Sequence, residues 1–256
     1  MSFLSKHLEQ SYGAPGSLRR RVLKRFKHRS FKRFMVLTRS RTGSNMLMSF
    51  LNSHPNARAD GEVFSKLNGR DYRQVLAEVY ARQPIFVKAK GFKIFYYHPL
   101  DGQPDEVLGH LRSQEDLCVI HLKRRNILRT LISRKIAGLQ GLWAVDRTKA
   151  VDKGTRKSVS FSADELEEGF QQTRAWEEAA DRAFERHPLI SVHYEDLVAN
   201  RDASFERVLT FLGLPALPLE TNLRRQNPES LRALVTNYDS LKSAFAATPW
   251  RSFFDE

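Results

Sequence analysis

The sequence predicts an α/β fold with three layers (α/β/α), in which helices cover both faces of a central parallel sheet. Two observations predict it. Short apolar runs typical of strands alternate with helix-periodic segments along most of the 256 residues, which is the pattern of right-handed βαβ units. The run 117–122 is apolar apart from His121, as expected of a parallel strand that is buried on both faces.

The predicted strands are short runs of apolar, aromatic or β-branched residues. They lie at 34–38, 85–87, 91–96, 117–122 and 189–192. Because they alternate with predicted helices, we expect a parallel sheet that is covered on both faces.

The predicted helices carry apolar residues at helical spacing. They lie at 44–53, 71–82, 105–112, 127–137, from 162 to about 184, and at 204–212, 229–235 and 239–246. The first stops at His54-Pro55 because the residue before a proline disfavours helix. Ser162 to Glu165 predicts a capping box for the long helix, with Trp176 on its apolar side, and Gly213 predicts the end of the next.

The net charge of +13 is concentrated near the N-terminus, where no acid occurs between Glu9 and Asp60. A dense basic run from Arg19 to Arg33 would attract nucleic acid, anionic lipid or an acidic substrate. A solvated, partly disordered leader is the alternative, and it stays open. We expect a basic appendage over 1–30 and a single domain over 31–256.

Other bulk features point to the cytoplasm, with peripheral attachment to a membrane as a further option. No apolar run is long enough to span a bilayer, and the first residues lack the apolar core of a signal peptide. The single cysteine, Cys118, cannot form an internal disulfide, which fits a reducing compartment. Its position in an apolar run predicts a buried thiol.

The junction after the first strand combines two arginines, hydroxyl residues and a glycine. The residues are Arg39, Ser40, Arg41, Thr42, Gly43 and Ser44. A strand that turns into a helix presents backbone N–H groups and a positive helix end to one spot, so this composition predicts a phosphate or sulfate site. A tight turn with an N-cap would explain Gly43 and Ser44, but it would leave the two arginines unexplained.

The junction does not match the motif of the metal-dependent nucleotide hydrolases, GxxxxGK[ST]. The strand at 117–122 runs into Lys123-Arg124-Arg125 and not into an acid that could hold Mg²⁺. The sequence therefore predicts no metal site and argues against an ATP- or GTP-hydrolysing enzyme.

A second strand-to-helix junction repeats the arrangement. Arg125 ends a strand, and Ser133 follows eight residues later with Arg129 four residues before it, on the same helical face. An arginine and a hydroxyl there would bind a second phosphate. A solvated basic helix is the alternative. Two such sites suit a nucleotide that carries phosphates at both ends of its ribose.

The pair resembles the two nucleotide-binding elements of the sulfotransferases that use 3′-phosphoadenosine 5′-phosphosulfate (PAPS). In that family an Arg and a Ser at this spacing hold the 3′-phosphate. The segments 192–197 and 211–214 also recur there, and 223–226, 237–238 and 253–254 look most like the rhizobial nodulation-factor (carbohydrate) sulfotransferases. The resemblance covers nearly the whole chain except the basic leader and 141–160, and it implies a P-loop-NTPase-like sulfotransferase fold.

The resemblance also implies roles for individual residues. Glu62, in a Gly-Glu context, would be the general base, and Arg41 and Lys93 would neutralise charge at the sulfuryl group. A surface carboxylate or a structural ion pair is the alternative for Glu62, and pairing with an acid is the alternative for Lys93. The PAPS-binding residues would be Arg39, Ser40, Arg41, Thr42, Gly43, Ser44, Asn45, Arg125, Ser133 and Arg225.

The expected activity is sulfuryl transfer from PAPS to a hydroxyl of a carbohydrate or glycolipid. A phenolic, alkaloid-like or peptide acceptor is one alternative, and a non-catalytic basic protein that binds nucleotides or nucleic acid is another. The expected partners are the acceptor and, through the basic N-terminus, a membrane surface; the resemblance argues against nucleic acid.

Overall fold

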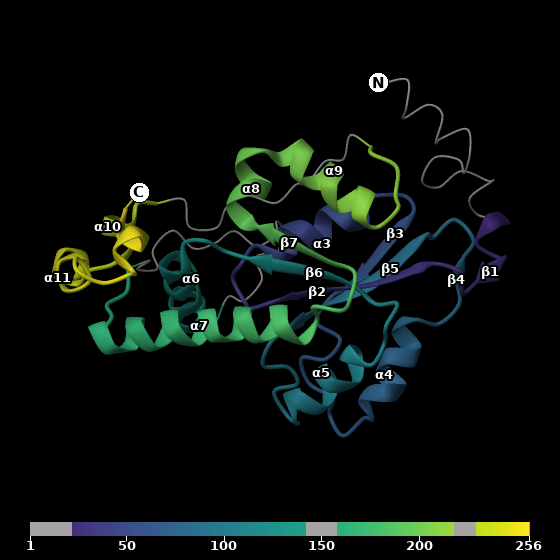
Figure 1. Ribbon diagram of the computed structural model, residues 1–256, viewed down its shortest axis with the longest axis horizontal. Helices are drawn as coiled ribbons and strands as arrows, with labels where there is room; N and C mark the ends of the chain where they lie inside the picture. Colours follow the sequence, from purple (N-terminus) through teal and green to yellow (C-terminus); the bar gives the residue numbers. More distant parts are fainter. Residues whose placement is uncertain (1–21, 142–157, 218–228, 256) are drawn as a thin grey trace. The chain divides into compact units, whose positions relative to one another are not determined.

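The computed structural model describes residues 22–141, 158–217 and 229–255 (Figure 1). The chain divides into two compact units. Unit 1 comprises Met1–Lys123 and Ala179–Leu223, and unit 2 comprises Arg124–Glu178 and Arg224–Glu256. The prediction of one domain over 31–256 stays a prediction.

Unit 1 contains a five-stranded sheet in which every neighbouring pair of strands is parallel. Its order is β3 (Ala57–Asp60), β5 (Ala89–Phe95), β2 (Lys32–Thr38), β6 (Cys118–Lys123) and β7 (Leu189–His193). The first strand along the chain to enter this sheet, β2, is therefore its centre. The predicted α/β class with a central parallel sheet is confirmed.

Helices cover both faces of this sheet (Figure 1). One face carries α3 (Ser44–Ser53), α8 (Tyr194–Ala199) and α9 (Arg201–Phe211), and the other carries α4 (Tyr72–Val79) and α5 (Pro104–Arg112). Apolar side chains of the first three helices join those of the sheet in one buried cluster. The burial of this apolar surface is the main term that stabilises the layers.

The register brings the ends of three strands to one edge of the sheet. Val36 lies opposite Lys93 in the β2–β5 pair, and Asp60 lies opposite Phe92 in the β3–β5 pair. The chain that leaves each strand at this edge therefore contributes side chains to a common region, where open α/β sheets bind their ligands.

Unit 2 is built from helices packed around aromatic residues. It contains α6 (Ile127–Gln140), most of α7 (Ala163–Ala183), α10 (Leu231–Leu234), α11 (Tyr238–Ala244) and the 3-10 helix η1 (Arg251–Phe254). The ring centroid of Phe170 lies 5.6 Å from that of Phe245 and 5.0 Å from that of Phe253. Val159 forms an isolated bridge with Val235.

Several sequence predictions of elements are wrong in informative ways. The predicted strand at 85–87 is a turn, because Val87 N–H donates to the carbonyl oxygen of Pro84 (2.8 Å). The strand of this region is β4 (Gln83–Pro84), which pairs with β1 (Lys27–His28). Strand β3 was not predicted because its sequence, ARAD, alternates small and charged residues and carries no β-forming pattern.

The long helix α7 buries the expected apolar face, apart from Trp176. Its buried residues are Leu166, Phe170, Thr173, Glu177 and Ala180. Glu177, held by Arg174 at 2.9 Å, takes the position expected for Trp176, which is only half-buried. The predicted cap is present, since Glu165 N–H donates to Ser162 Oγ (3.1 Å).

Candidate functional site

The loop after β2 is held by hydroxyl groups inside it. The Thr38 hydroxyl donates to the carbonyl oxygen of Leu122 (2.6 Å). The Thr42 oxygen lies 2.6 Å from that of Thr38 and 2.8 Å from the carbonyl oxygen of Arg39. Both threonines are fully buried. The Thr42 side chain thus contributes to the shape of the loop, and its predicted contact with PAPS stays a prediction.

The backbone of this loop enters the left-handed region twice, at Arg41 (φ 69°) and at Gly43 (φ 88°). A Cβ atom on Gly43 would lie 2.3 Å from Cδ2 of Tyr194. Only glycine therefore fits this position, both for its conformation and for the ring that packs on it. The sequence showed a turn glycine here, but it gave no sign of the contact with Tyr194.

Gly43 is also the N-cap of α3, and no side chain caps the helix. The first turn contains no acidic residue. Uncapped backbone N–H groups and the positive end of the helix dipole then face the loop, which is the general arrangement for binding an anion. Burial lowers the pKa of the half-buried Arg41 guanidinium within the same loop.

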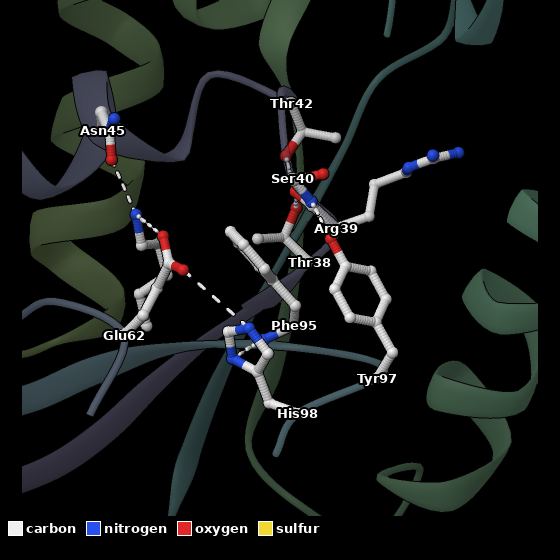
Figure 2. A network of polar contacts seen from close by, with 10 residues as sticks. Thr38, Arg39, Ser40, Thr42, Asn45, Glu62, Phe95, Tyr97 and His98 are labelled. Carbon is white, nitrogen blue, oxygen red and sulfur yellow. Dashed lines mark hydrogen bonds and ion pairs between the residues drawn. The ribbon is translucent and has the colours of Figure 1, made fainter. Parts of the chain in front are cut away.

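Four side chains from three segments meet beside this helix end, and we call them the Glu62 cluster: Asn45, Glu62, Lys93 and His98. Figure 2 labels Asn45, Glu62 and His98. Lys93 Nζ donates to Asn45 Oδ1 (2.6 Å) and lies 2.9 Å from Glu62 Oε1. The Lys93 side chain is 5% exposed and that of Glu62 is 34% exposed. The structure thus brings together three of the predicted residues and leaves the carboxylate open to solvent.

His98 belongs to this cluster and was not predicted. It is fully buried, and its Nδ1 accepts from the N–H of Phe95 (3.4 Å), which places the proton of the neutral ring on Nε2. Nε2 lies 3.9 Å from Glu62 Oε2. Burial lowers the pKa of His98 to about 4, although Glu62 acts to raise it. The sequence signal would have been a His-Pro pair just past an aromatic strand.

Ser40 and Arg39 belong to the loop after β2 and are drawn apart from Glu62, beside Tyr97 (Figure 2). Ser40 N–H donates to the phenol oxygen of Tyr97 (3.3 Å). Its Oγ is buried and makes no hydrogen bond within the described part of the chain. Arg39 is 2% exposed, and its side chain extends away from Glu62. Their predicted contacts with PAPS stay predictions.

A second buried polar network in unit 1 was also missed. His121 Nε2 lies 2.7 Å from the phenol oxygen of Tyr96, and its Nδ1 lies 2.7 Å from Asp181 Oδ1. Lys123 Nζ donates to Asp181 Oδ2 (2.5 Å). Burial lowers the pKa of His121 to about 4. A neutral imidazole therefore joins β6 to Tyr96, the residue after β5, and to the end of α7.

The other predicted phosphate site lies in unit 2. Arg125 is exposed and Ser133 is buried on α6. The N-cap of this helix is Asn126, whose side chain accepts from Arg129 N–H (3.1 Å) and donates to the carbonyl oxygen of Phe253 (3.0 Å). Arg129 itself donates to the carbonyl oxygen of Glu229 (3.2 Å). The predicted Arg225 lies outside the described residues.

Three further observations bear on binding. A cavity of about 930 Å³ between α6 and α7 is lined by residues such as Leu131, Phe161 and Gln171, and by none of the predicted site residues.

In the described ranges, no cluster of His, Cys, Asp or Glu could hold a metal ion. Nor does any described helix have the length and apolarity required to cross a membrane.

The sequence of this chain is similar to those of several known proteins. The family model described as the sulfotransferase family matches residues 111–218. Nodulation protein H of Rhizobium tropici is 32% identical over 241 residues, an alignment that covers 87% of this chain and 92% of that protein. Nodulation protein H of Rhizobium meliloti (strain 1021) is 27% identical over 237 residues, covering 87% and 94%.

Solved structures are similar to this chain at a low level. A sulfotransferase from Alicyclobacillus acidocaldarius is 12% identical with a TM-score of 0.49, over 83% of this chain and 90% of that one. A mouse sulfotransferase complexed with PAP is 13% identical with a TM-score of 0.42, over 77% and 63%.

Proposed function

The chain belongs to the sulfotransferase family, and from that premise we propose that it transfers a sulfuryl group from PAPS to a carbohydrate hydroxyl with Glu62 as the general base. The observation that carries this proposal is the Glu62 cluster beside the uncapped start of α3. A proton acceptor and an anion-binding helix end are the two parts that such a transfer requires.

Glu62 suits the role of base because its two oxygens have different surroundings. Oε1 is held by Lys93 at 2.9 Å, whereas Oε2 faces the neutral His98 at 3.9 Å, beyond hydrogen-bond distance. The carboxylate is thus oriented by one oxygen and retains an acceptor on the other. An ion pair with Lys93 is also what a purely structural role would produce, so a kinetic test must separate the two roles.

The proposed reaction is an in-line displacement at sulfur. The acceptor hydroxyl oxygen forms a bond to sulfur while Glu62 takes the hydroxyl proton. The bond between sulfur and the 5′-phosphate oxygen breaks, and its electrons leave with adenosine 3′,5′-bisphosphate (PAP). Arg41 and Lys93 would neutralise the charge that develops on the leaving oxygen, as cations do in phosphoryl transfer.

Binding of the donor is proposed residue by residue. The loop residues Arg39 to Asn45 would bind the 5′-phosphosulfate through N–H groups, hydroxyls and guanidinium groups. Arg125 and Ser133 would bind the 3′-phosphate, on the resemblance of their eight-residue spacing. Arg225 is carried over in the same role. No metal is expected to take part, and undiminished transfer in excess EDTA would agree with this.

The acceptor class rests on the resemblance to nodulation-factor sulfotransferases, whose acceptor is a lipo-chitooligosaccharide. The test is the release of PAP from PAPS with a chitin oligosaccharide, with a simple phenol and with a tyrosine peptide. Transfer to the oligosaccharide alone supports the proposal. Transfer to the phenol or the peptide alone would change the acceptor class, and binding of PAP without any transfer would favour a non-catalytic nucleotide-binding protein.

The role of Glu62 is tested by Glu62→Gln, with Glu106→Gln on the exposed face of α5 as the matched control. Loss of a general base should lower kcat roughly 10²–10⁴-fold, while the affinity for PAP stays the same and the control keeps full activity. If Glu62→Gln retained wild-type kcat, Glu62 would be a structural ion-pair partner and the base would lie elsewhere.

A further inference from the structure

The segment 22–33, which we call the basic segment, carries charge that the proposed reaction does not use. It contains no acidic residue, and its basic residues are Lys24, Arg25, Lys27, Arg29, Lys32 and Arg33. The last two have partners, since Arg33 pairs with Asp116 and Lys32 Nζ donates to the carbonyl oxygen of Phe211 (2.9 Å). The first four are exposed and make no ion pair with any residue that the structure describes.

The basic segment is fixed to unit 1 and is not a free leader. Strand β1 pairs with β4, with Lys27 opposite Pro84 and His28 opposite Gln83. The N–H of Ile85 donates to the carbonyl oxygen of Phe26 (3.0 Å), and His28 Nε2 donates to the carbonyl oxygen of Val87 (2.9 Å). Figure 1 draws β1 and β4 side by side. The solvated-leader alternative therefore does not describe residues 26–28.

Two large apolar side chains stand out of this basic surface. Phe26 is 59% exposed, although its own carbonyl group is bonded to Ile85, and Val22 is 49% exposed. A turn joins the two, because Arg25 N–H donates to the carbonyl oxygen of Val22 (3.0 Å). This surface combines a solvent-exposed aromatic ring with unpaired cations, which is the composition of surfaces that bind at the bilayer interface.

The cations of the basic segment are also far from the candidate donor site. The segment leads into the amino end of β2, whereas the loop 39–43 follows its carboxyl end. A seven-residue strand spans roughly 20 Å, about twice the distance over which exposed charges interact at physiological salt. The charge of the segment therefore has a different partner from the sulfuryl donor.

We propose that the basic segment docks unit 1 on the surface of an anionic phospholipid bilayer, with Phe26 and Val22 inserted among the headgroups. The cations attract the phosphates and carboxylates of the lipids. The two apolar side chains would insert into a bilayer, whereas binding to the phosphate backbone of a nucleic acid would not require them. Nucleic acid is thus the competing polyanion, and the test includes it.

The experiment is co-sedimentation of the full chain with phosphatidylcholine vesicles that contain either no phosphatidylserine or about one third of it, an amount that gives a strongly negative surface. We expect binding only to the anionic vesicles, and weaker binding at high salt. Absence of binding to them at low salt would overturn the proposal.

Two variants and two matched controls separate the contributions. Phe26→Ser should lower vesicle binding roughly fivefold or more, and the double variant Lys24→Glu with Arg25→Glu should lower it at least tenfold. The controls are Leu100→Ser, an apolar side chain that is 58% exposed, and Lys66→Glu with Arg186→Glu, two exposed cations elsewhere in unit 1. Neither control should change binding.

A DNA duplex titrated with the same proteins decides between the two polyanions. Vesicle binding that depends on Phe26 supports the proposal. Vesicle binding unaffected by Phe26→Ser, together with duplex binding of equal strength, would overturn it in favour of a nucleic-acid surface. Transfer from PAPS in the absence of lipid should be the same in all these variants, so the result does not depend on the proposed reaction.

Discussion

The turn from β2 into α3 and the turn from β6 into α6 are both rich in arginine, yet the two helices begin differently. Gly43 is the N-cap of α3, and no side chain closes that helix end. Asn126 is the N-cap of α6, and its side chain accepts from Arg129 N–H at 3.1 Å. At the first junction, therefore, no side chain that the structure describes accepts from the backbone N–H groups of the helix start. At the second, the Asn126 side chain accepts from one of them.

This difference suggests two ways of recognising an anion on one chain. At α3 the uncapped N–H groups and the helix dipole would do most of the binding. At α6 the helix start is capped, so two side chains would do most of the anion binding, the exposed Arg125 and the buried Ser133. Anion binding by the backbone at α3 should tolerate substitutions that change only a side chain, but not those that change the backbone conformation. Anion binding by side chains at α6 should tolerate small changes of the backbone, but not loss of the side chain that binds.

The largest effect is expected from a change in backbone geometry at the first junction. Gly43→Ala places a Cβ atom 2.3 Å from the Tyr194 ring at a φ of 88°. We expect the free energy of unfolding to fall by about 3 kcal/mol, from left-handed strain and overpacking together, and PAP binding to weaken. Chemical denaturation and PAP titration measure the two effects.

The matched control for this change is Gly109→Ala, a helical glycine of α5 around which a Cβ atom would meet nothing within 4 Å. It should be neutral or slightly stabilising. Wild-type stability in Gly43→Ala would mean that the loop adjusts freely, and the account of a backbone-defined site would then be wrong.

Acid should affect the first junction before the second, because all histidines among the residues that the structure describes lie in unit 1. Burial lowers the pKa of both His98 and His121 to about 4, from an ordinary value of 6.5. Between these values the unfolded chain binds more protons than the folded one, so stability is lost as the pH falls from 6.5 towards 4. The loss should be about 2 kcal/mol for each histidine near pH 5.

Amide hydrogen exchange at neutral and mildly acidic pH resolves this difference by region. Protection of β5 and β6 should decrease on acidification while that of α6 changes less. Equal loss of protection in all three would show that the two units respond together and that the buried histidines are not the cause.

A smaller effect is expected from opening the second helix end. Asn126→Ala removes the cap of α6 and the bond to Phe253. It should lower the free energy of unfolding by about 1 kcal/mol and leave the affinity for PAP unchanged, since side chains would bind the anion there. A tighter or a much weaker PAP complex would instead indicate that the end of α6 takes part.

The sequence predicted the parts of this molecule that depend on local pattern. The bounds of α3 and the end of the strand before it follow from an apolar run, a glycine turn and His54-Pro55, whereas the strand begins two residues earlier than predicted, at Lys32. Asn45, Glu62 and Lys93 were singled out by resemblance, and the structure brings them together. Contacts between distant residues were not predicted: His98 reaches Glu62, and Tyr194 packs on Gly43, only in the folded sheet.

The proposed function requires a donor with a phosphate at each end of its ribose. Its test is calorimetric titration of PAP and of AMP, which lacks the 3′-phosphate, into wild type, Arg125→Ala and the exposed control Arg134→Ala. Wild type and control should prefer PAP. Arg125→Ala should weaken PAP binding roughly 10–100-fold and leave AMP binding unchanged. Equal affinity of wild type for the two nucleotides, or an undiminished preference for PAP in Arg125→Ala, would contradict the account.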